Sequence, residues 1–269
     1  MKFSVLLSVY RKEQAFYLRQ SLDSIFSQTL LPDEVILVKD GPLTDELDRV
    51  VEEFVLEYPA LKVVPLTENQ GLGKALNEGL KHCSYELVAR MDTDDVAKPA
   101  RFEKQMAVFQ IHQEFDVVGA WIDEFEGDVE NVISIRKLPE RHEKISSFAK
   151  KRCPVNHPVV MFKKSAVVAA GGYQHFPLFE DYYLWVRMLM NGSVFYNIPE
   201  SLLYFRFSPD MFKRRGGWKY AKDEFRFQCK LLGLGFIGCV EFCRNVGIRF
   251  VARIIPNGWR SLLYKKVLR

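Results

Sequence analysis

Apolar residues in the first part of the chain form short continuous runs that alternate with segments of helical periodicity. Four runs have the length and composition of buried strands: residues 3–9, 34–39, 62–66 and 86–91. Helices are expected between and after them, over residues 15–27, 43–58, 72–82 and 99–112. Strands separated by single helices require a mostly parallel sheet with right-handed crossovers, so the predicted fold class is α/β.

The residues just beyond these strands are the first candidates for a functional site. Parallel sheets of this kind bind ligands at the carboxyl ends of their strands. In this chain those positions hold Tyr10, Asp40, Asn69 and Asp92. We therefore expect these four residues to lie along one edge of the sheet.

The second half of the chain has a mixed pattern. Strands are predicted at residues 117–124, 132–135, 158–162, 193–197 and 202–205, and a helix at 181–190. From about Gly217 onward the pattern is helical, with interruptions at 233–235 and at Pro256. A sheet-containing domain followed by a helical extension is therefore expected.

Composition and charge narrow the class of protein. Of the 269 residues, 48% are hydrophobic and 27% are charged, which is typical of a soluble globular chain. The net charge of +4 is concentrated at residues 241–269, which carry +6, so the rest of the chain carries −2. A body without a basic surplus argues against nucleic-acid binding.

The apolar segments near the two ends are short. Charged residues at positions 11–13 follow the first run at once, and no small-residue cleavage site appears, so we expect a buried strand rather than a signal peptide. The run at residues 231–240 is too short to span a bilayer. The five cysteines are odd in number and lack zinc-ribbon spacing, which favours free thiols in a reducing cytosol.

The strongest chemical signal is the segment Arg90-Met91-Asp92-Thr93-Asp94-Asp95. Its three carboxylates follow a predicted buried strand directly, and like charges at such spacing repel unless a cation lies between them. Short acidic side chains suit Mg²⁺ or Mn²⁺ rather than zinc, and Mg²⁺ completes its coordination with phosphate and water. The segment predicts a clamp for a diphosphate and a metal ion; a solvated turn before the next helix is the alternative.

Two further segments fit a phosphate-bearing nucleotide. Asp40 is followed by Gly41 and Pro42, which make a sharp turn and leave a carboxylate free for a ring N–H of a base. The segment from Asn69 through Gly71 to Lys74 precedes a predicted helix, whose N-terminal N–H groups attract phosphate. An ordinary turn and a glycine-rich connector are the respective alternatives, and neither segment is a Walker loop or a dinucleotide fingerprint.

A fourth signal is the acidic pair Glu180-Asp181, which opens an aromatic helix. One interpretation is helix capping, because acids favour the positive end of the helix dipole. The other is a general base for a sugar hydroxyl, which requires a carboxylate held near the reacting carbon in apolar surroundings.

Taken together, these segments resemble the family 2 glycosyltransferases with the GT-A fold. The run from Ser4 through Ser8 to Tyr10, the pair Asp40-Gly41, Asn69-x-Gly71, the Asp92-x-Asp94-Asp95 motif and Glu180-Asp181 occur in that family's order and at about its spacing. The segments at His157 and at Gly171-Gly172-Tyr173 look like its acceptor-side segments. The resemblance covers roughly residues 1–207.

The resemblance implies a division of labour among these residues. It assigns Asp40 to the base, Asp92 to ribose and phosphates, Asp94 to the metal and Asp181 to catalysis as the base. Asp95 would support the loop or the donor sugar. Further nucleotide-sugar candidates are Ser8, Tyr10, Asn69, Gly71, Lys74 and Arg90, and the acceptor-side candidates are His157, Glu180 and Trp218.

The same resemblance implies the domain plan and the activity. A GT-A catalytic domain would span residues 1–210, with a nucleotide-sugar half at 1–98 and an acceptor half at 99–210, followed by a basic amphipathic helical tail at 211–269. The expected activity is inverting transfer of a hexose, galactose or glucose, from a UDP-sugar to a sugar acceptor, with Mn²⁺ or Mg²⁺ as cofactor.

One departure from the family pattern affects the donor site. The family usually has Asp-Asp-Gly where this chain has Lys39-Asp40-Gly41, so one acid is missing from the predicted uridine pocket. The Lys-Asp-Gly variant resembles a bacterial subgroup that builds O-antigen, capsule and exopolysaccharide. This resemblance favours galactose or glucose as the donor sugar. The expected location is the cytoplasm, and a membrane-binding tail would place the enzyme on the inner face of the plasma membrane and fit a polyprenyl-diphosphate-linked acceptor.

Several alternatives stay open at this point. Residues 241–269 mix apolar residues with seven Lys/Arg, which suits either an anionic membrane surface or a helix packed on the domain. The basic residues 213–215 before Trp218 suit acceptor phosphate or a basic loop. A non-catalytic nucleotide-sugar-binding scaffold of the same fold is the alternative function, whereas the missing Gly-x-Gly-x-x-Gly argues against a dinucleotide-dependent oxidoreductase.

Overall fold

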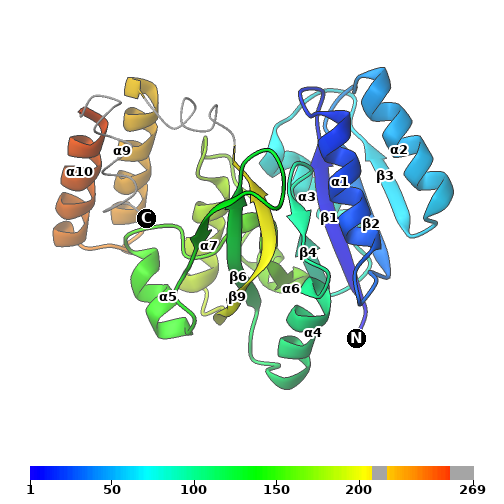
Figure 1. Ribbon diagram of the computed structural model, residues 1–269. Coiled ribbons are helices and arrows are strands. Elements are labelled where there is room, and N and C mark those ends of the chain that lie inside the picture. Colours follow the sequence, from blue (N-terminus) through cyan, green and yellow to red (C-terminus); the bar gives the residue numbers. More distant parts are fainter. Residues whose placement is uncertain (208–216, 255–269) are drawn as a thin grey trace.

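The computed structural model describes residues 1–207 and 217–254 (Figure 1). In the first half, strands and helices alternate as predicted. The elements are β1 (Phe3–Val9), α1 (Ala15–Phe26), β2 (Glu34–Lys39), α2 (Asp45–Glu57), β3 (Leu61–Pro65), α3 (Leu72–His82), β4 (Leu87–Arg90), β5 (Val96–Ala97) and α4 (Arg101–Ile111). In the second half they are β6 (Val117–Phe125), β7 (Val132–Arg136), α5 (His142–Ala149), a 3₁₀ turn (His157–Val159), β8 (Met161–Lys163), α6 (Lys164–Ala169), α7 (Glu180–Met190), β9 (Phe195–Arg206), α9 (Gly217–Gly233) and α10 (Cys239–Ile254).

The first four strands pair in parallel in the order β3-β2-β1-β4, as the alternation of strands and helices requires. Successive residues of these strands point to opposite faces, so their apolar runs fill two cores. On β2, for example, Val35 and Leu37 join one core whereas Ile36 and Val38 join the other. The carboxyl ends of β1, β2 and β4 therefore lie along one edge of the sheet.

The second half extends the same sheet with mixed pairing. Strand β8 is antiparallel to both β4 and β6, and β9 lies parallel to β6 before it pairs with the short β5. Within the described residues the order of strands in the sheet is β3-β2-β1-β4-β8-β6-β9-β5, and β7 pairs with β6. Strand β9 thus returns to β5, the strand that follows the acidic motif.

Two sequence predictions in this half were wrong. The strand expected at residues 158–162 begins only at Met161, because Pro158 sits in the 3₁₀ turn and has no N–H to give to a sheet. The two strands expected at 193–197 and 202–205 form one continuous β9, which keeps its pairing to β6 across Pro199 through a shift in register. Helices α5 and α6 and the short β5 were not anticipated.

Helices cover both faces of the sheet. Helices α1, α2 and α4 contribute to the core on one face, and α3, α5, α6 and α7 to the core on the other. Helix α3 lies close to the strands: a Cβ at Gly79 would stand 2.5 Å from Leu6 and 2.6 Å from Val38. This three-layer arrangement is the GT-A architecture that the resemblance implied.

Helices α9 and α10 form an antiparallel pair that packs on α7 (Figure 1). Phe227 of α9 is fully buried, and its ring stacks on that of Phe179 with centroids 4.8 Å apart. Asn245 of α10 donates to the Lys150 carbonyl and to Gln228. The packed alternative is therefore what the structure shows for residues 217–249 of the predicted tail, whereas 208–216 and 255–269 lie outside the described residues.

No helix within the described residues combines the length and the apolar character needed to cross a bilayer. The apolar run at 231–240 covers the end of α9, the turn after it and the first residues of α10.

We predict that Phe227→Ala lowers the free energy of unfolding by about 3–5 kcal/mol, because it opens a cavity between α9 and α7. Denaturant unfolding followed by far-ultraviolet circular dichroism measures the change. Phe225→Ala on the outward side of α9, where the side chain is 48% exposed, is the control and should cost less than about 1 kcal/mol. Equal effects of the two substitutions would show that α9 is not part of the folded core.

Candidate active site

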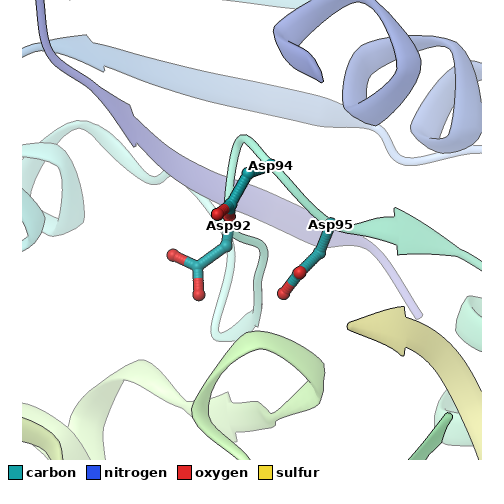
Figure 2. Close-up of side chains that lie close together, drawn as sticks. All are labelled: Asp92, Asp94 and Asp95. Carbon is teal, nitrogen blue, oxygen red and sulfur yellow. The ribbon is translucent and has the colours of Figure 1, made fainter. Parts of the chain in front are cut away.

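The three carboxylates of Asp92, Asp94 and Asp95 come together in the turn between β4 and β5 (Figure 2). One oxygen atom from each residue lies within 4.8 Å of the others. Around an octahedral Mg²⁺, with metal–oxygen distances of about 2.1 Å, ligand oxygens are about 3 Å apart in adjacent positions and about 4.2 Å apart in opposite ones. The three side chains therefore need only small shifts to share one divalent cation.

The electrostatics of this cluster favour a bound cation. Burial and the neighbouring charges of Asp92 and Glu13 raise the pKa of Asp94 to about 7. Burial and repulsion from Asp94 and Asp92 also raise the pKa of Asp95 far above its ordinary range. In addition, the Asp95 Oδ2 atom is buried without a hydrogen-bond partner. A hard cation would relieve both the repulsion and the unpaired oxygen, so the residues present fit Mg²⁺ or Mn²⁺.

Arg206, the last residue of β9, holds the acidic turn in place. Its backbone N–H donates to Asp95 Oδ1 at 2.8 Å, and its Nε donates to the Asp94 carbonyl at 2.8 Å. The same guanidinium donates to Gln20 and lies over the ring of Tyr17 at 3.9 Å. Asp95 thus supports the loop, which is one of its two expected roles.

Two other residues fasten the turn from the side of β1 and α1. The Ser21 hydroxyl donates to the Asp92 carbonyl at 2.8 Å, and the Thr93 hydroxyl donates to Glu13 at 3.0 Å. Burial raises the pKa of Glu13, which adds a fourth carboxylate near the cluster. Sequence reasoning missed Glu13, Ser21 and Arg206, because none of them belongs to a motif and Arg206 lies 111 residues from Asp95.

A buried arginine lies on the other side of the turn. Arg90 is inaccessible to solvent and forms an ion pair with Asp92, while its Nε and Nη1 atoms are buried without hydrogen-bond partners. Arg101 donates to the Arg90 carbonyl at 2.5 Å, and burial together with the positive Arg90 lowers the pKa of Arg101 to about 9. Arg90 therefore acts on this region mainly through its charge.

The loop after β2 is organised by Asp40. The carboxylate of Asp40 is almost fully buried and accepts from the backbone N–H groups of Gln70 at 2.7 Å and Gly71 at 3.0 Å, and from the Asn69 side chain at 3.0 Å. Gly41 permits this approach, because a Cβ there would stand 2.7 Å from the Asn69 nitrogen. Asp40 thus shapes the 69–71 loop, and any contact with a base would be additional to that role.

The other donor-side candidates lie around this loop. Lys39, the departure from the family pattern, forms an ion pair with Asp48 of α2. Gly71 takes a positive φ of 88° immediately before α3, and Lys74 is exposed in the first turn of that helix. On β1, Ser8 is half-buried opposite Val38, and Tyr10 is 38% exposed just beyond the strand.

The acidic pair Glu180-Asp181 occupies the first turn of α7 and faces the start of α3. A Cβ at Gly73 would stand 3.5 Å from both the Glu180 side chain and that of Tyr173. The Cys153 thiol lies 3.7 Å from Asp181 Oδ2, in position to donate to it. Burial, the neighbouring Asp181 and the contact between them raise the pKa of Cys153, so this neighbour of Asp181 stays a neutral thiol.

Tyr173 is buried and feels the charges of both the acidic pair and the Asp92–Asp95 turn. Its pKa is raised chiefly by burial and further by the charges of Asp181 and Asp92, which places both carboxylates within electrostatic reach of one phenol. The backbone of Tyr173 exchanges two hydrogen bonds with Asn77 of α3 at 2.7 and 2.8 Å. The charges of Asp181 and Asp92 therefore both act on the Tyr173 phenol.

The remaining acceptor-side candidates are separated. His157 Nε2 lies 2.9 Å from the Tyr173 hydroxyl, and burial together with the charge of Arg90 lowers the pKa of His157 well below its ordinary value, so its ring is neutral. Trp218, in contrast, is 76% exposed at the start of α9, next to residues 208–216, which lie outside the described part of the chain.

Comparison with known proteins agrees with this geometry. Residues 4–167 match the family model described as "Glycosyl transferase family 2". The chain is 39% identical over its whole length to the Escherichia coli UDP-Gal:alpha-D-GlcNAc-diphosphoundecaprenol beta-1,3-galactosyltransferase, of which it covers 97%, and 41% identical over 98% of both chains to the amylovoran biosynthesis glycosyltransferase AmsE of Erwinia amylovora.

Solved structures share the fold at low sequence identity. S. aureus TarS 1–349, in complex with UDP-GlcNAc, superposes with a TM-score of 0.67 at 18% identity, over 99% of this chain and 76% of that one. A Pyrobaculum calidifontis mannosyltransferase in complex with GDP-Man and Mn²⁺ gives a TM-score of 0.65 at 20% identity, over 96% of this chain and 71% of that one. The chain therefore belongs to glycosyltransferase family 2 and has the GT-A fold.

Proposed function

We propose that this glycosyltransferase moves galactose from UDP-galactose to a sugar carried on a lipid diphosphate, in the synthesis of a bacterial surface polysaccharide. The proposal is carried by one observation: three carboxylates with oxygen atoms within 4.8 Å of one another suit a divalent cation, and the charges of Asp92 and of the separate Asp181 both act on the buried phenol of Tyr173. The two full-length relatives support the substrate class, because one is named for UDP-Gal and a GlcNAc-diphosphoundecaprenol acceptor and the other for amylovoran synthesis.

On the donor side, the proposed roles follow from charge. Asp94, with Asp92 and Asp95 beside it, would hold Mn²⁺ or Mg²⁺, which when bound neutralises charge on a leaving diphosphate. Lys74 is exposed at the N-terminus of α3, where backbone N–H groups also attract phosphate. Arg90 adds positive charge beneath Asp92.

The base of the nucleotide is assigned to the loop around Asp40. Asp40 follows β2, and three donors from the 69–71 loop, which follows β3, already fix the orientation of its carboxylate. Ser8, Tyr10, Asn69 and Gly71 lie at or near the same edge and complete the proposed nucleotide-sugar site. A rigid loop of this kind lowers the entropic cost of ordering the nucleotide.

On the acceptor side, Asp181 would take the proton from the attacking hydroxyl. It occupies the first turn of α7, with buried Tyr182 and Tyr183 after it and the neutral Cys153 thiol beside it. A hydroxyl activated from the face opposite the diphosphate displaces it directly, so the anomeric carbon inverts and an α-linked donor gives a β-linkage. Glu180 and His157 remain proposed acceptor contacts.

A non-catalytic nucleotide-sugar-binding scaffold is the alternative function. It would need Asp40 and its loop but would have no use for the strained cluster at Asp92–Asp95 or for Asp181. Retention of all four carboxylates therefore favours the enzyme.

We predict that Asp94→Asn abolishes the stabilisation of the protein by Mn²⁺. In the wild-type protein, Mn²⁺ with UDP should raise the midpoint of thermal unfolding, because ligands that bind only the folded state stabilise it, and EDTA should reverse the effect. Differential scanning fluorimetry measures both. Glu52→Gln, which removes an exposed carboxylate on α2, is the matched control. A full Mn²⁺ shift in Asp94→Asn would remove Asp94 from the metal site.

The same variant carries a pH signature. Because the folded-state pKa of Asp94 is raised to about 7, its ionisation destabilises the metal-free fold above about pH 7, and this cost fades as the pH falls towards 4. Without metal, Asp94→Asn should therefore be more stable than the wild-type protein at pH 8, and the difference should shrink by pH 5.

We predict that Asp181→Asn keeps UDP affinity within about twofold but lowers the transfer rate by roughly 100-fold or more, because the amide cannot accept the hydroxyl proton. Isothermal titration with UDP and Mn²⁺ measures the first quantity and release of UDP from the donor the second. The neighbouring Glu180→Gln is the control and should lose less activity. Near-normal turnover by Asp181→Asn would refute its role as the base.

A donor screen tests the function itself. With a synthetic GlcNAc-diphosphate-alkyl acceptor and Mn²⁺, we expect UDP-galactose to give product in preference to UDP-glucose, UDP-GlcNAc and GDP-mannose. Proton NMR of the product should show a β-linkage. UDP binding without turnover of any donor would favour the scaffold, and an α-linked product would refute inversion.

A further inference from the structure

Helices α9 and α10 present an outward surface whose exposed charges all have one sign. Across residues 217–249 the exposed charged side chains are Lys219, Lys222, Arg226, Lys230 and Arg244. Two of the three acids of the same segment are withdrawn from solvent. Asp223 and Glu224 are buried, with Asp223 paired to Arg226 and Glu224 to Arg249, and the half-buried Glu241 accepts from the Gly238 N–H at 3.1 Å. The segregation shows a surface from which negative charge is excluded.

On α9 the exposed basic residues form a row. Lys219, Lys222, Arg226 and Lys230 follow one another at intervals of three or four residues, which keeps them on one side of the helix. The opposite side of α9, with Phe227 and Leu231, faces α7 and is fully buried. The basic row is therefore an outward feature of a helix that is firmly docked.

Apolar side chains lie beside this row and also face outward. Trp218 is 76% exposed, and Phe225, two turns later, is 48% exposed and contacts Phe242 of α10. On α10, Val240 is 80% exposed and Ile248 is 49% exposed. Exposed aromatic and aliphatic groups next to a basic row are the composition of helices that lie in the interface of an anionic bilayer.

The charge of this surface limits what can cover it. Residues 250–269 contain five Lys/Arg and no Asp/Glu, so the remainder of the chain would add positive charge rather than neutralise it. A second copy docked through the same surface would place like charges opposite each other. An anionic partner with an apolar layer satisfies both kinds of side chain at once.

We propose that the outward surface of α9, defined by Trp218, Lys219, Lys222, Phe225, Arg226 and Lys230, docks on an anionic phospholipid membrane. This inference deepens the proposed function, on which its purpose rests, because a lipid-diphosphate acceptor lies at such a surface. The proposed surface is connected directly to the proposed base. Phe227, on the inner side of α9, stacks on Phe179, which immediately precedes the first turn of α7, where Asp181 lies. Docking would therefore hold the proposed base at a fixed place relative to the bilayer.

Vesicle co-sedimentation tests the proposal with the full chain. Vesicles of phosphatidylglycerol and phosphatidylcholine at a 3:7 ratio should bind the protein, and pure phosphatidylcholine should bind it far less. The triple variant Lys219→Gln/Lys222→Gln/Lys230→Gln leaves the Arg226–Asp223 pair intact and should weaken binding roughly tenfold or more. The control Lys2→Gln/Arg49→Gln/Lys81→Gln removes the same charge from exposed sites in the β1–α3 half and should bind as the wild-type protein does.

A second substitution and an activity measurement separate this proposal from the proposed function. Trp218→Ser should weaken vesicle binding without a change in net charge. The lysine variant should keep wild-type transfer to a short-chain, water-soluble acceptor, so failure of catalysis and failure of docking are distinguished. Equal binding to neutral and anionic vesicles, undiminished binding of the lysine variant, or a dimer by sedimentation velocity that the lysine variant disrupts would each overturn the proposal.

Discussion

The repulsion among three carboxylates in one short turn is the constraint on which the rest of this structure depends. Asp92, Asp94 and Asp95 are crowded and largely withdrawn from water, which raises the pKa of Asp94 and Asp95. A free loop would relieve this repulsion by moving apart. The turn is instead held from three directions, by Ser21 at the Asp92 carbonyl, Arg206 at Asp94 and Asp95, and the Arg90 ion pair with Asp92. The fold therefore keeps ready a site whose repulsion a divalent cation would relieve.

This constraint explains the return path of the chain. Arg206 reaches the acidic turn only because β9 runs alongside β6 and then pairs with β5, the strand that follows the turn. Asn77 fixes the backbone of Tyr173 against α3, and Gly172 takes a positive φ of 62° where a Cβ would stand 2.6 Å from that asparagine. The second half of the domain thus supplies Arg206, one of the three supports of the turn, as well as the proposed base.

The first half of the fold could be predicted because its signals are local. Each parallel strand is a continuous apolar run, each helix has its own periodicity, and the acids at Asp92–Asp95 are adjacent in sequence. The supports could not be predicted, since Ser21 and Arg206 meet the turn across 71 and 111 residues and carry no motif. The role of Asp40 was predicted only in part. The sequence indicates a turn with a free carboxylate, whereas in the structure that carboxylate accepts hydrogen bonds from the 69–71 loop.

The charges counted from the sequence could not show whether the helical extension binds a membrane or packs on the domain. The sequence places basic residues and acids side by side on α9, and a count treats Asp223 and Glu224 as cancelling their neighbours. In the folded structure both acids are buried, with Glu224 paired to Arg249 of α10, and the lysines stay outside, so folding creates a surface more basic than the segment's composition. One helix can therefore pack on the domain with its inner side and present a basic, aromatic surface on its outer side. The packing of Phe227 that fixes α9 on the catalytic domain is also what orients its basic row outward.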